Sequence, residues 1–135
     1  LRRNDWLDRA ELIEDDAFDV LNRRSRENQN FDFIALDPPA FARSRSQLDQ
    51  AKRGYKEANL RAMRMLKDQG ILATSSCSAP VSRDDFVALV RESASDAHTA
   101  CRVLEERNQP PDHPWLPDLP SSLYLKCLLC EISLR

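Results

Sequence analysis

The chain has 135 residues, a length that fits one domain built around a single hydrophobic core. Apolar residues make up 41% and charged residues 31%, and no apolar run approaches the roughly 20 residues of a membrane helix, which excludes a transmembrane protein. The formal net charge of -2 excludes an argument for nucleic-acid binding from overall charge alone. Only two glycines occur, so the chain has no glycine-rich loop of the kind that cradles a cofactor.

The first predicted elements are two strands joined by a polar connector. Residues 11–14 predict a short strand, and residues 20–30 form the connector, which includes the end of a short helix. Residues 31–36 are almost continuously apolar, which is typical of a central parallel strand covered on both faces. The sequence Asp37-Pro38-Pro39 stops this strand abruptly, because proline cannot donate to a strand ladder.

A long helix and a third strand follow. Between residues 46 and 67 apolar side chains recur every three or four positions, which predicts one buried face of a helix, and Gly70 is expected to end it. Residues 71–74 predict another buried strand, which ends in the polar turn 75–78.

The last predicted elements are a helix and a hairpin. Ser82 and Asp85 have the spacing of a helix cap, and the helix is expected to run through Ser93. Residues 101–105 and 123–129 predict two strands of a hairpin, joined by a proline-rich loop. The whole order indicates an α/β fold with a mostly parallel sheet and an antiparallel last hairpin. Functional residues are then expected at the carboxyl ends of the strands.

Two of these strand ends carry residues suited to chemistry. A carboxylate at Asp37, fixed by two prolines and followed by Phe41, suits a flat hydrogen-bonding ligand such as an unpaired base. The alternative is a carboxylate that merely ends a strand. Cys77 follows the next strand between small hydroxyl residues, where it can act as a nucleophile or simply be a small buried residue.

The remaining cysteines and histidines offer weaker signals. Cys127 and Cys130 have Cys-x-x-Cys spacing, but on one strand they face opposite sides and no second pair accompanies them, so no metal site is expected. With Cys77 and Cys101 they predict reduced thiols in the cytoplasm. His113 lies in the proline-rich loop, where it is either a substrate contact or a solvated side chain.

Positive charge is concentrated after the Asp-Pro-Pro sequence. Residues 43–67 contain eight basic side chains against two acidic ones. This segment either neutralises the phosphates of an RNA bound over the crevice or forms a solvated helix face.

Three segments together resemble one family. Residues 31–44 (FDFIALDPPAFARS), residues 53–62 (RGYKEANLRA) and the triplet Ser76-Cys77-Ser78 resemble class I S-adenosylmethionine (SAM)-dependent 23S ribosomal RNA cytosine-5 methyltransferases, whose full-length members carry an N-terminal PUA domain. Gln109, the sequence at 112–114 and the sequence at 124–126 also match the C-terminal pattern of that family. The resemblance implies a Rossmann-like class I methyltransferase fold, with residues 1–135 as the C-terminal part of the catalytic domain.

The resemblance also implies roles for individual residues. Cys77 matches the nucleophile, which attacks carbon 6 of cytosine, while Asp37 holds the ring nitrogen. The resemblance implies SAM as the cofactor and large-subunit ribosomal RNA as the partner. The residues expected at the cofactor are Asp16, Ala17, Phe18, Asp37, Pro38 and Pro39. Those expected at the RNA substrate are Phe41, Arg43, Lys52, Arg53, Tyr55 and His113.

The family places its glycine-rich cofactor loop before the first residue of this chain, so the chain alone is expected to bind the cofactor poorly.

Three other hypotheses stay open: an amino-nitrogen methyltransferase in which Cys77 is only structural, a non-catalytic RNA-binding module, and a poorly folded piece with an exposed sheet edge. The sequence leaves the target nucleotide open, and also the choice between a monomer and a homodimer.

Overall fold

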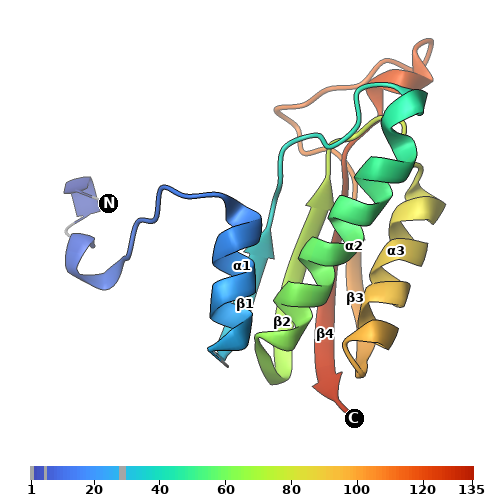
Figure 1. Ribbon diagram of the computed structural model, residues 1–135. Helices are drawn as coiled ribbons and strands as arrows, with labels where there is room; N and C mark the ends of the chain where they lie inside the picture. Colours follow the sequence, from blue (N-terminus) through green and yellow to red (C-terminus); the bar gives the residue numbers. More distant parts are fainter. Residues whose placement is uncertain (1, 5, 28–29) are drawn as a thin grey trace.

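The computed structural model describes residues 2–4, 6–27 and 30–135 of the chain (Figure 1). It contains three α-helices and four strands: α1 (Ala17–Arg26), β1 (Phe31–Leu36), α2 (Leu48–Arg64), β2 (Leu66–Ser76), α3 (Arg83–Asp96), β3 (Thr99–Arg107) and β4 (Lys126–Leu134). The alternation of helices and strands confirms the predicted α/β class. Of the predicted polar connector, residues 28 and 29 lie outside the described part, and its first half belongs to α1.

The four strands form one sheet in the order β1-β2-β4-β3. β1 and β2 run parallel, whereas β4 is antiparallel to both of its neighbours. The predicted hairpin of β3 and β4 is confirmed, but β4 also inserts beside β2. The parallel arrangement is therefore limited to the β1–β2 pair within the described residues, because the long loop before β4 lets it return antiparallel to β2.

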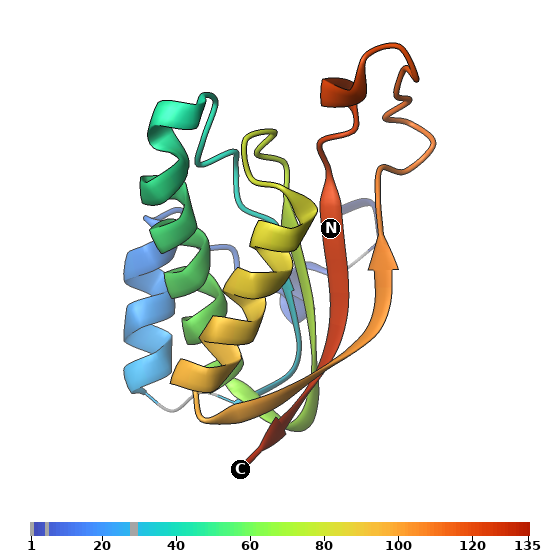
Figure 2. The ribbon, with the colours of Figure 1, turned by 90° about the vertical axis from the view of Figure 1, so that its right-hand side faces the viewer.

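The helices α1, α2 and α3 cover one face of this sheet (Figure 2). The strand periodicity shows how the core is built, because alternate residues of β4 are buried against the helices: Lys126, Leu128, Cys130 and Ile132. They meet large side chains from α2 and α3, among them the fully buried Tyr55 and Phe86. In the described part of the chain no helix is long and apolar enough to cross a membrane.

The predicted cap of α3 is confirmed, whereas the predicted end of α2 is wrong. The Ser82 hydroxyl accepts a hydrogen bond from the Asp85 backbone N–H at 3.0 Å, and Asp85 returns the contact, which completes a capping box. Helix α2 ends at Arg64, and Gly70 instead lies inside β2 opposite Ile132. A Cβ atom at Gly70 would lie 2.8 Å from the Lys67 carbonyl oxygen, so the glycine permits a close backbone approach within the strand.

The strand predicted at residues 11–14 is not formed. These residues are extended but irregular, and Leu12 is 76% exposed. In the described residues β1 pairs only with β2, so its other edge is open, and residues 11–14 pair with no strand. A short segment gains little from an extended conformation when its backbone groups remain unpaired.

Candidate active site

The carboxyl ends of β1 and β2 bring Asp37 and Cys77 together. The Ser75 hydroxyl donates a hydrogen bond to Asp37 Oδ1 at 2.5 Å, which ties the carboxylate to the neighbouring strand. The Cys77 thiol contacts the Pro38 carbonyl oxygen at 3.9 Å. Because β1 and β2 are parallel neighbours, the residues that follow them meet at the same edge of the sheet. The two predicted catalytic residues thus lie at one site.

A buried hydroxyl fixes the two loops of this site relative to each other. Ser78 Oγ accepts a hydrogen bond from the Ala42 backbone N–H at 3.1 Å and lies 2.9 Å from the Tyr55 hydroxyl. The resemblance places Tyr55 at the substrate, but in the structure its side chain is fully buried in the core. It lies on the apolar face of α2, as the helical periodicity of residues 46–67 indicates. Its role is to hold the loop that carries Cys77.

A row of aromatic rings leads from the site into the core. The centroids of Phe18 and Phe41 are 5.8 Å apart, those of Phe41 and Tyr55 are 4.6 Å apart, and Tyr55 meets Phe86 edge to face at 5.9 Å. Gly54 allows the close packing of Phe41 on α2, because a Cβ atom there would lie 3.2 Å from the Phe41 ring. The Asp-Pro-Pro loop is therefore anchored by its own aromatic residue.

Removal of the Tyr55 hydroxyl is expected to weaken this anchoring. The variant Tyr55→Phe keeps the ring but loses the hydrogen bond to Ser78, which should lower the free energy of unfolding by about 1 kcal/mol. Urea denaturation checks the value. The matched control is Tyr124→Phe, since the half-buried Tyr124 hydroxyl makes no hydrogen bond within residues 30–135, and this variant should leave stability almost unchanged.

A cavity of about 570 Å³ opens beside Asp37, between α1, α2 and the end of β1. Every residue that the resemblance assigns to the cofactor lines it: Asp16, Ala17, Phe18, Asp37, Pro38 and Pro39. Phe41 and Leu21 add apolar surface. Mostly apolar walls with a few carboxylates suit a flat, partly polar ligand.

Asp16 lines this cavity and also caps the N-terminus of α1. Its Oδ1 atom accepts hydrogen bonds from the backbone N–H groups of Phe18 at 2.8 Å and Asp19 at 3.3 Å, which caps the start of α1. The cap orients the Phe18 ring toward Phe41. Asp16 Oδ2 has no hydrogen-bond partner among the described residues and is free to accept one from a ligand in the cavity.

Lys126 is a residue of this site that the sequence reasoning did not assign. It is 9% exposed at the start of β4, and its ammonium donates to the carbonyl oxygens of Ser78 at 2.9 Å and Val81 at 2.7 Å. Burial lowers the pKa of Lys126, while the charge of Cys77 acts in the opposite direction. A signal was present in the sequence, because a lysine two residues before Leu128 shares the buried face of a predicted strand.

Cys127 also lies at this end of the sheet, on the face without helices. It pairs with Ser75 across β2 and β4. Burial and then the negative charge of Asp37 raise the pKa of the Cys127 thiol, so this thiol stays protonated near neutral pH. Cys127 is thus poorly suited to be a nucleophile. Among the described residues no cluster of His, Cys, Asp or Glu has the arrangement of a metal site.

The basic segment is only partly available for RNA phosphates. Lys52 forms an ion pair with Asp85 at 2.5 Å, and Lys56 with Asp96 at 3.0 Å. Arg61 and Lys67 are paired in the same way with Glu57 and Asp32. The prediction for Lys52 as an RNA contact is therefore weakened. The basic side chains of this segment without a carboxylate partner among the described residues are Arg43, Arg45, Arg53 and Arg64, the last of which donates to the backbone carbonyl oxygen of Asp96 at 3.1 Å.

The proline-rich loop between β3 and β4 lies at the same edge of the sheet (Figure 1). The Gln109 side chain links separate parts of this loop by two hydrogen bonds. Its Oε1 atom accepts from the Tyr124 backbone N–H at 2.6 Å, and its Nε2 atom donates to the His113 carbonyl oxygen at 2.7 Å. The imidazole of His113 is exposed and lies 3.2 Å from its neighbour Asp112. The structure places it in this loop without a contact to Cys77 or Asp37.

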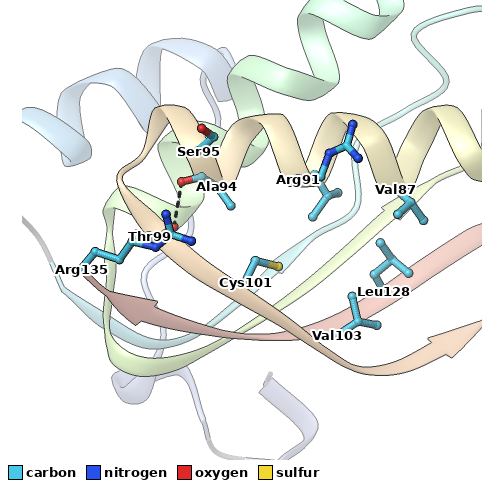
Figure 3. A pocket seen from close by; sticks show the side chains of 10 residues that line it. Val87, Arg91, Ala94, Ser95, Thr99, Cys101, Val103, Leu128 and Arg135 are labelled. Atoms are coloured by element: carbon cyan, nitrogen blue, oxygen red, sulfur yellow. Dashed lines mark hydrogen bonds between the residues drawn. The ribbon is translucent and has the colours of Figure 1, made fainter.

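A second cavity of about 250 Å³ lies between α3 and strands β3 and β4 (Figure 3). Its walls are mostly aliphatic, with Val87, Val103 and Leu128 facing one another, and Cys101 lies at its base. It contains no carboxylate, and neither Asp37 nor Cys77 lines it. The chemistry of the site therefore belongs to the cavity at the end of β1.

The fold is a Rossmann-like one of the kind found in class I methyltransferases, as comparison with solved structures shows. No protein-family model matches the chain. A protein described as a SAM-dependent methyltransferase from Streptococcus mutans superposes with a TM-score of 0.72 and 21% identity, over 90% of this chain and 30% of that one. The methyltransferase SMU.776, solved with SAH, gives a TM-score of 0.66 and 22% identity over 87% of this chain and 30% of that chain.

Comparison of sequences finds relatives with higher identity to this chain than the solved structures have. Over 126 residues, 93% of this chain, it is 39% identical to ribosomal RNA large subunit methyltransferase I of Cronobacter sakazakii and 40% identical to the protein of that name from Enterobacter sp.. The chain spans about a third of the length of these relatives, 32% in each case. The matches confirm the resemblance to large-subunit ribosomal RNA methyltransferases that the three sequence motifs indicate.

Proposed function

We propose that this chain is part of a methyltransferase that transfers a methyl group from SAM to carbon 5 of a cytosine in large-subunit ribosomal RNA. The observation that carries the proposal is the meeting of Asp37 and Cys77 beside the cavity at the end of β1. The names of the relatives support RNA as the substrate class. The cysteine mechanism and the target atom rest on the motif that contains Cys77.

The cavity suits the adenosine end of SAM. Phe18 offers a ring for the purine, and the Asp16 Oδ2 atom can accept a hydrogen bond from an exocyclic amino group. Asp37 and Pro38 lie where the cavity meets Cys77. When bound, SAM supplies an electrophilic methyl group. Neither glycine takes part, because Gly54 lies under Phe41 and Gly70 lies in β2.

The chain's own residues supply the covalent step. The Cys77 thiolate forms a bond to carbon 6 of cytosine, and the electron pair of the double bond between carbons 5 and 6 moves into the ring. Asp37 holds the ring nitrogen N3, on which negative charge develops, by a hydrogen bond that carries the proton. Carbon 5 thereby becomes nucleophilic and accepts the methyl group. Loss of the carbon 5 proton then restores the double bond and expels the thiolate.

Nucleoside analysis tests the target atom. The protein expressed from the complete reading frame that contains residues 1–135 is incubated with SAM and unmodified large-subunit RNA, and the digested RNA is analysed by mass spectrometry. The proposal predicts 5-methylcytidine. A methyl group on an exocyclic nitrogen would instead support an amino-nitrogen methyltransferase that uses Asp37-Pro38-Pro39, and RNA binding without any methylation would support a non-catalytic module.

The unpaired arginines are expected to set the salt dependence of RNA binding. Arg45→Gln and Arg53→Gln each remove a cation that has no acidic partner among the described residues. Each should weaken binding and lower the slope of log affinity against log salt by about one. The matched control is Arg61→Gln, because Arg61 is already paired with Glu57 at 2.7 Å. An equal effect of all three variants would mean that the whole helix face contacts RNA.

A further inference from the structure

The cavity between α3 and strands β3 and β4 has the size and the walls of a site for a small aliphatic group (Figure 3). Val87, Val90 and Leu128 line it, and Cys101 lies at its base. Its volume of about 250 Å³ is several times the roughly 30 Å³ that one water molecule occupies in the liquid. Ligand sites for drug-sized molecules begin at roughly 300 Å³. The cavity therefore suits a short aliphatic chain and is too small for a cofactor such as SAM.

The cavity opens to the outside because β3 diverges from α3 along its length (Figure 2). Thr99, at the start of β3, is 2% exposed, whereas Val103 at the rim of the cavity is 48% exposed. The register of β3 against β4 shifts between Val103 and Glu105, so a bulge lies next to this rim. Apolar walls offer water few hydrogen bonds, so an apolar group that displaces water from the cavity gains affinity.

The polar part of the rim is positively charged. Arg91 and Arg135 line the cavity, and neither has a carboxylate partner among the described residues. Ser95, which follows Arg91 by one helical turn on the same face of α3, also lines the cavity. Its hydroxyl makes no hydrogen bond within residues 30–135. Two guanidinium groups and one hydroxyl are thus available to an anion at the mouth of an aliphatic cavity.

The acidic side chains of the same half of α3 are paired elsewhere. Glu92 and Asp96 form ion pairs with Lys56 of α2, at 3.4 Å and 3.0 Å. No carboxylate lines the cavity itself. The charge at the cavity mouth is therefore not neutralised by the residues that the structure describes.

We propose that this cavity binds an aliphatic carboxylate, with the hydrocarbon chain between α3 and β3 and the carboxylate at Arg91 and Ser95. A guanidinium group can donate two parallel hydrogen bonds to a carboxylate, and a serine hydroxyl can donate one more. Arg135 adds a second positive charge. A neutral aliphatic ligand would gain only the apolar contacts, so the cavity selects for the anion.

This site is separate from the candidate active site. Neither Asp37 nor Cys77 lines the cavity, and it lies beside the opposite edge of the sheet from β1. Binding of the carboxylate is therefore expected with or without SAM and RNA. Failure of this proposal would leave the proposed function intact, and failure to methylate RNA would leave this binding site intact.

Isothermal titration calorimetry with three probes tests the ligand class. Octanoate, octanol and acetate are each titrated into the protein expressed from the complete reading frame that contains residues 1–135. Octanoate should bind roughly tenfold or more tightly than octanol, which lacks the charge, and than acetate, which lacks the chain. Equal affinities for octanoate and octanol, or no binding of octanoate, would overturn the proposal.

The Cys101 thiol reports where the probe binds. Cys101 and Cys127 are both half-buried, but only Cys101 lines this cavity. The protein is treated with N-ethylmaleimide, with and without octanoate, and the two cysteine peptides are quantified by mass spectrometry. Octanoate should slow alkylation of Cys101 and leave that of Cys127 unchanged. Binding of octanoate without protection of Cys101 would place the ligand elsewhere and overturn the proposal.

Substitution at the cavity mouth tests the role of the charge. Arg91 is exposed, so Arg91→Gln should leave the fold intact and weaken octanoate binding roughly tenfold, with little effect on octanol. The matched control is Arg102→Gln, because Arg102 lies on β3, points away from the cavity and is paired with Glu131 at 3.3 Å. This control should bind octanoate as the wild type does. Unchanged affinity in Arg91→Gln, or an equal loss in both variants, would contradict the assignment.

Discussion

Replacement of Cys77 by alanine is expected to reduce methyl transfer to cytosine by roughly a thousandfold or more, because the proposed mechanism assigns the bond to carbon 6 to the Cys77 thiolate. The side chain is only half-buried, so its loss should leave the fold intact. Turnover is measured as transfer of a radiolabelled methyl group to large-subunit RNA by the protein from the complete reading frame that contains residues 1–135.

The matched control for this prediction is Cys101→Ala. Cys101 is also half-buried, but it lies on β3 at the base of the second cavity and has no part in the proposed chemistry. Its replacement should leave turnover unchanged. Retained activity in Cys77→Ala would contradict the cysteine mechanism and favour an amino-nitrogen methyltransferase, in which the target amine attacks the methyl group directly.

The variant Asp37→Asn is expected to lose about 100- to 10,000-fold in turnover, the range found when a group that moves a proton is removed. The amide has the size of the carboxyl group, and its oxygen can still accept the hydrogen bond that Ser75 donates to Asp37 Oδ1. The loop should therefore keep its geometry. What is lost is the ability to share a proton with the ring nitrogen of cytosine while negative charge develops there.

Steady-state kinetics distinguish this role from simple binding. A role in the chemical step predicts a fall in kcat, whereas a role in ligand binding alone predicts a rise in KM. The matched control is Asp32→Asn on the same strand, where the carboxylate is exposed and paired with Lys67 at 2.7 Å. If both variants kept full activity, Asp37 would merely end the strand.

Local patterns were enough to predict most elements of this fold. The apolar run of β1, the periodicity of α2 and the Ser82–Asp85 cap are signals carried by neighbouring residues, and each corresponds to an observed element. The strand expected at residues 11–14 failed for a non-local reason, because a strand needs a partner and the open edge of β1 provides none for this segment. The expected helix end at Gly70 failed for a local reason, because Gly70 allows a close approach to the Lys67 carbonyl oxygen within β2.

The site was predictable where residues adjoin a strand end and unpredictable where tertiary packing decides. Asp37 and Cys77 follow parallel strands, so their meeting could be inferred from the fold class. The ion pair of Lys52 with Asp85 depends on how α2 packs against α3. Lys126 was missed because charged residues are rarely buried, although its place on the apolar face of β4 marked it as unusual.

The most direct test of the account is to trap the cysteine adduct. The protein from the complete reading frame is incubated with SAM and RNA in which 5-fluorocytidine replaces cytidine. Fluorine at carbon 5 cannot leave as a proton does, so the methylated adduct cannot expel the thiolate. The account predicts a stable protein–RNA complex that forms only with SAM and maps to the Cys77 peptide. Methylated RNA without such a complex, or a complex at another residue, would contradict it.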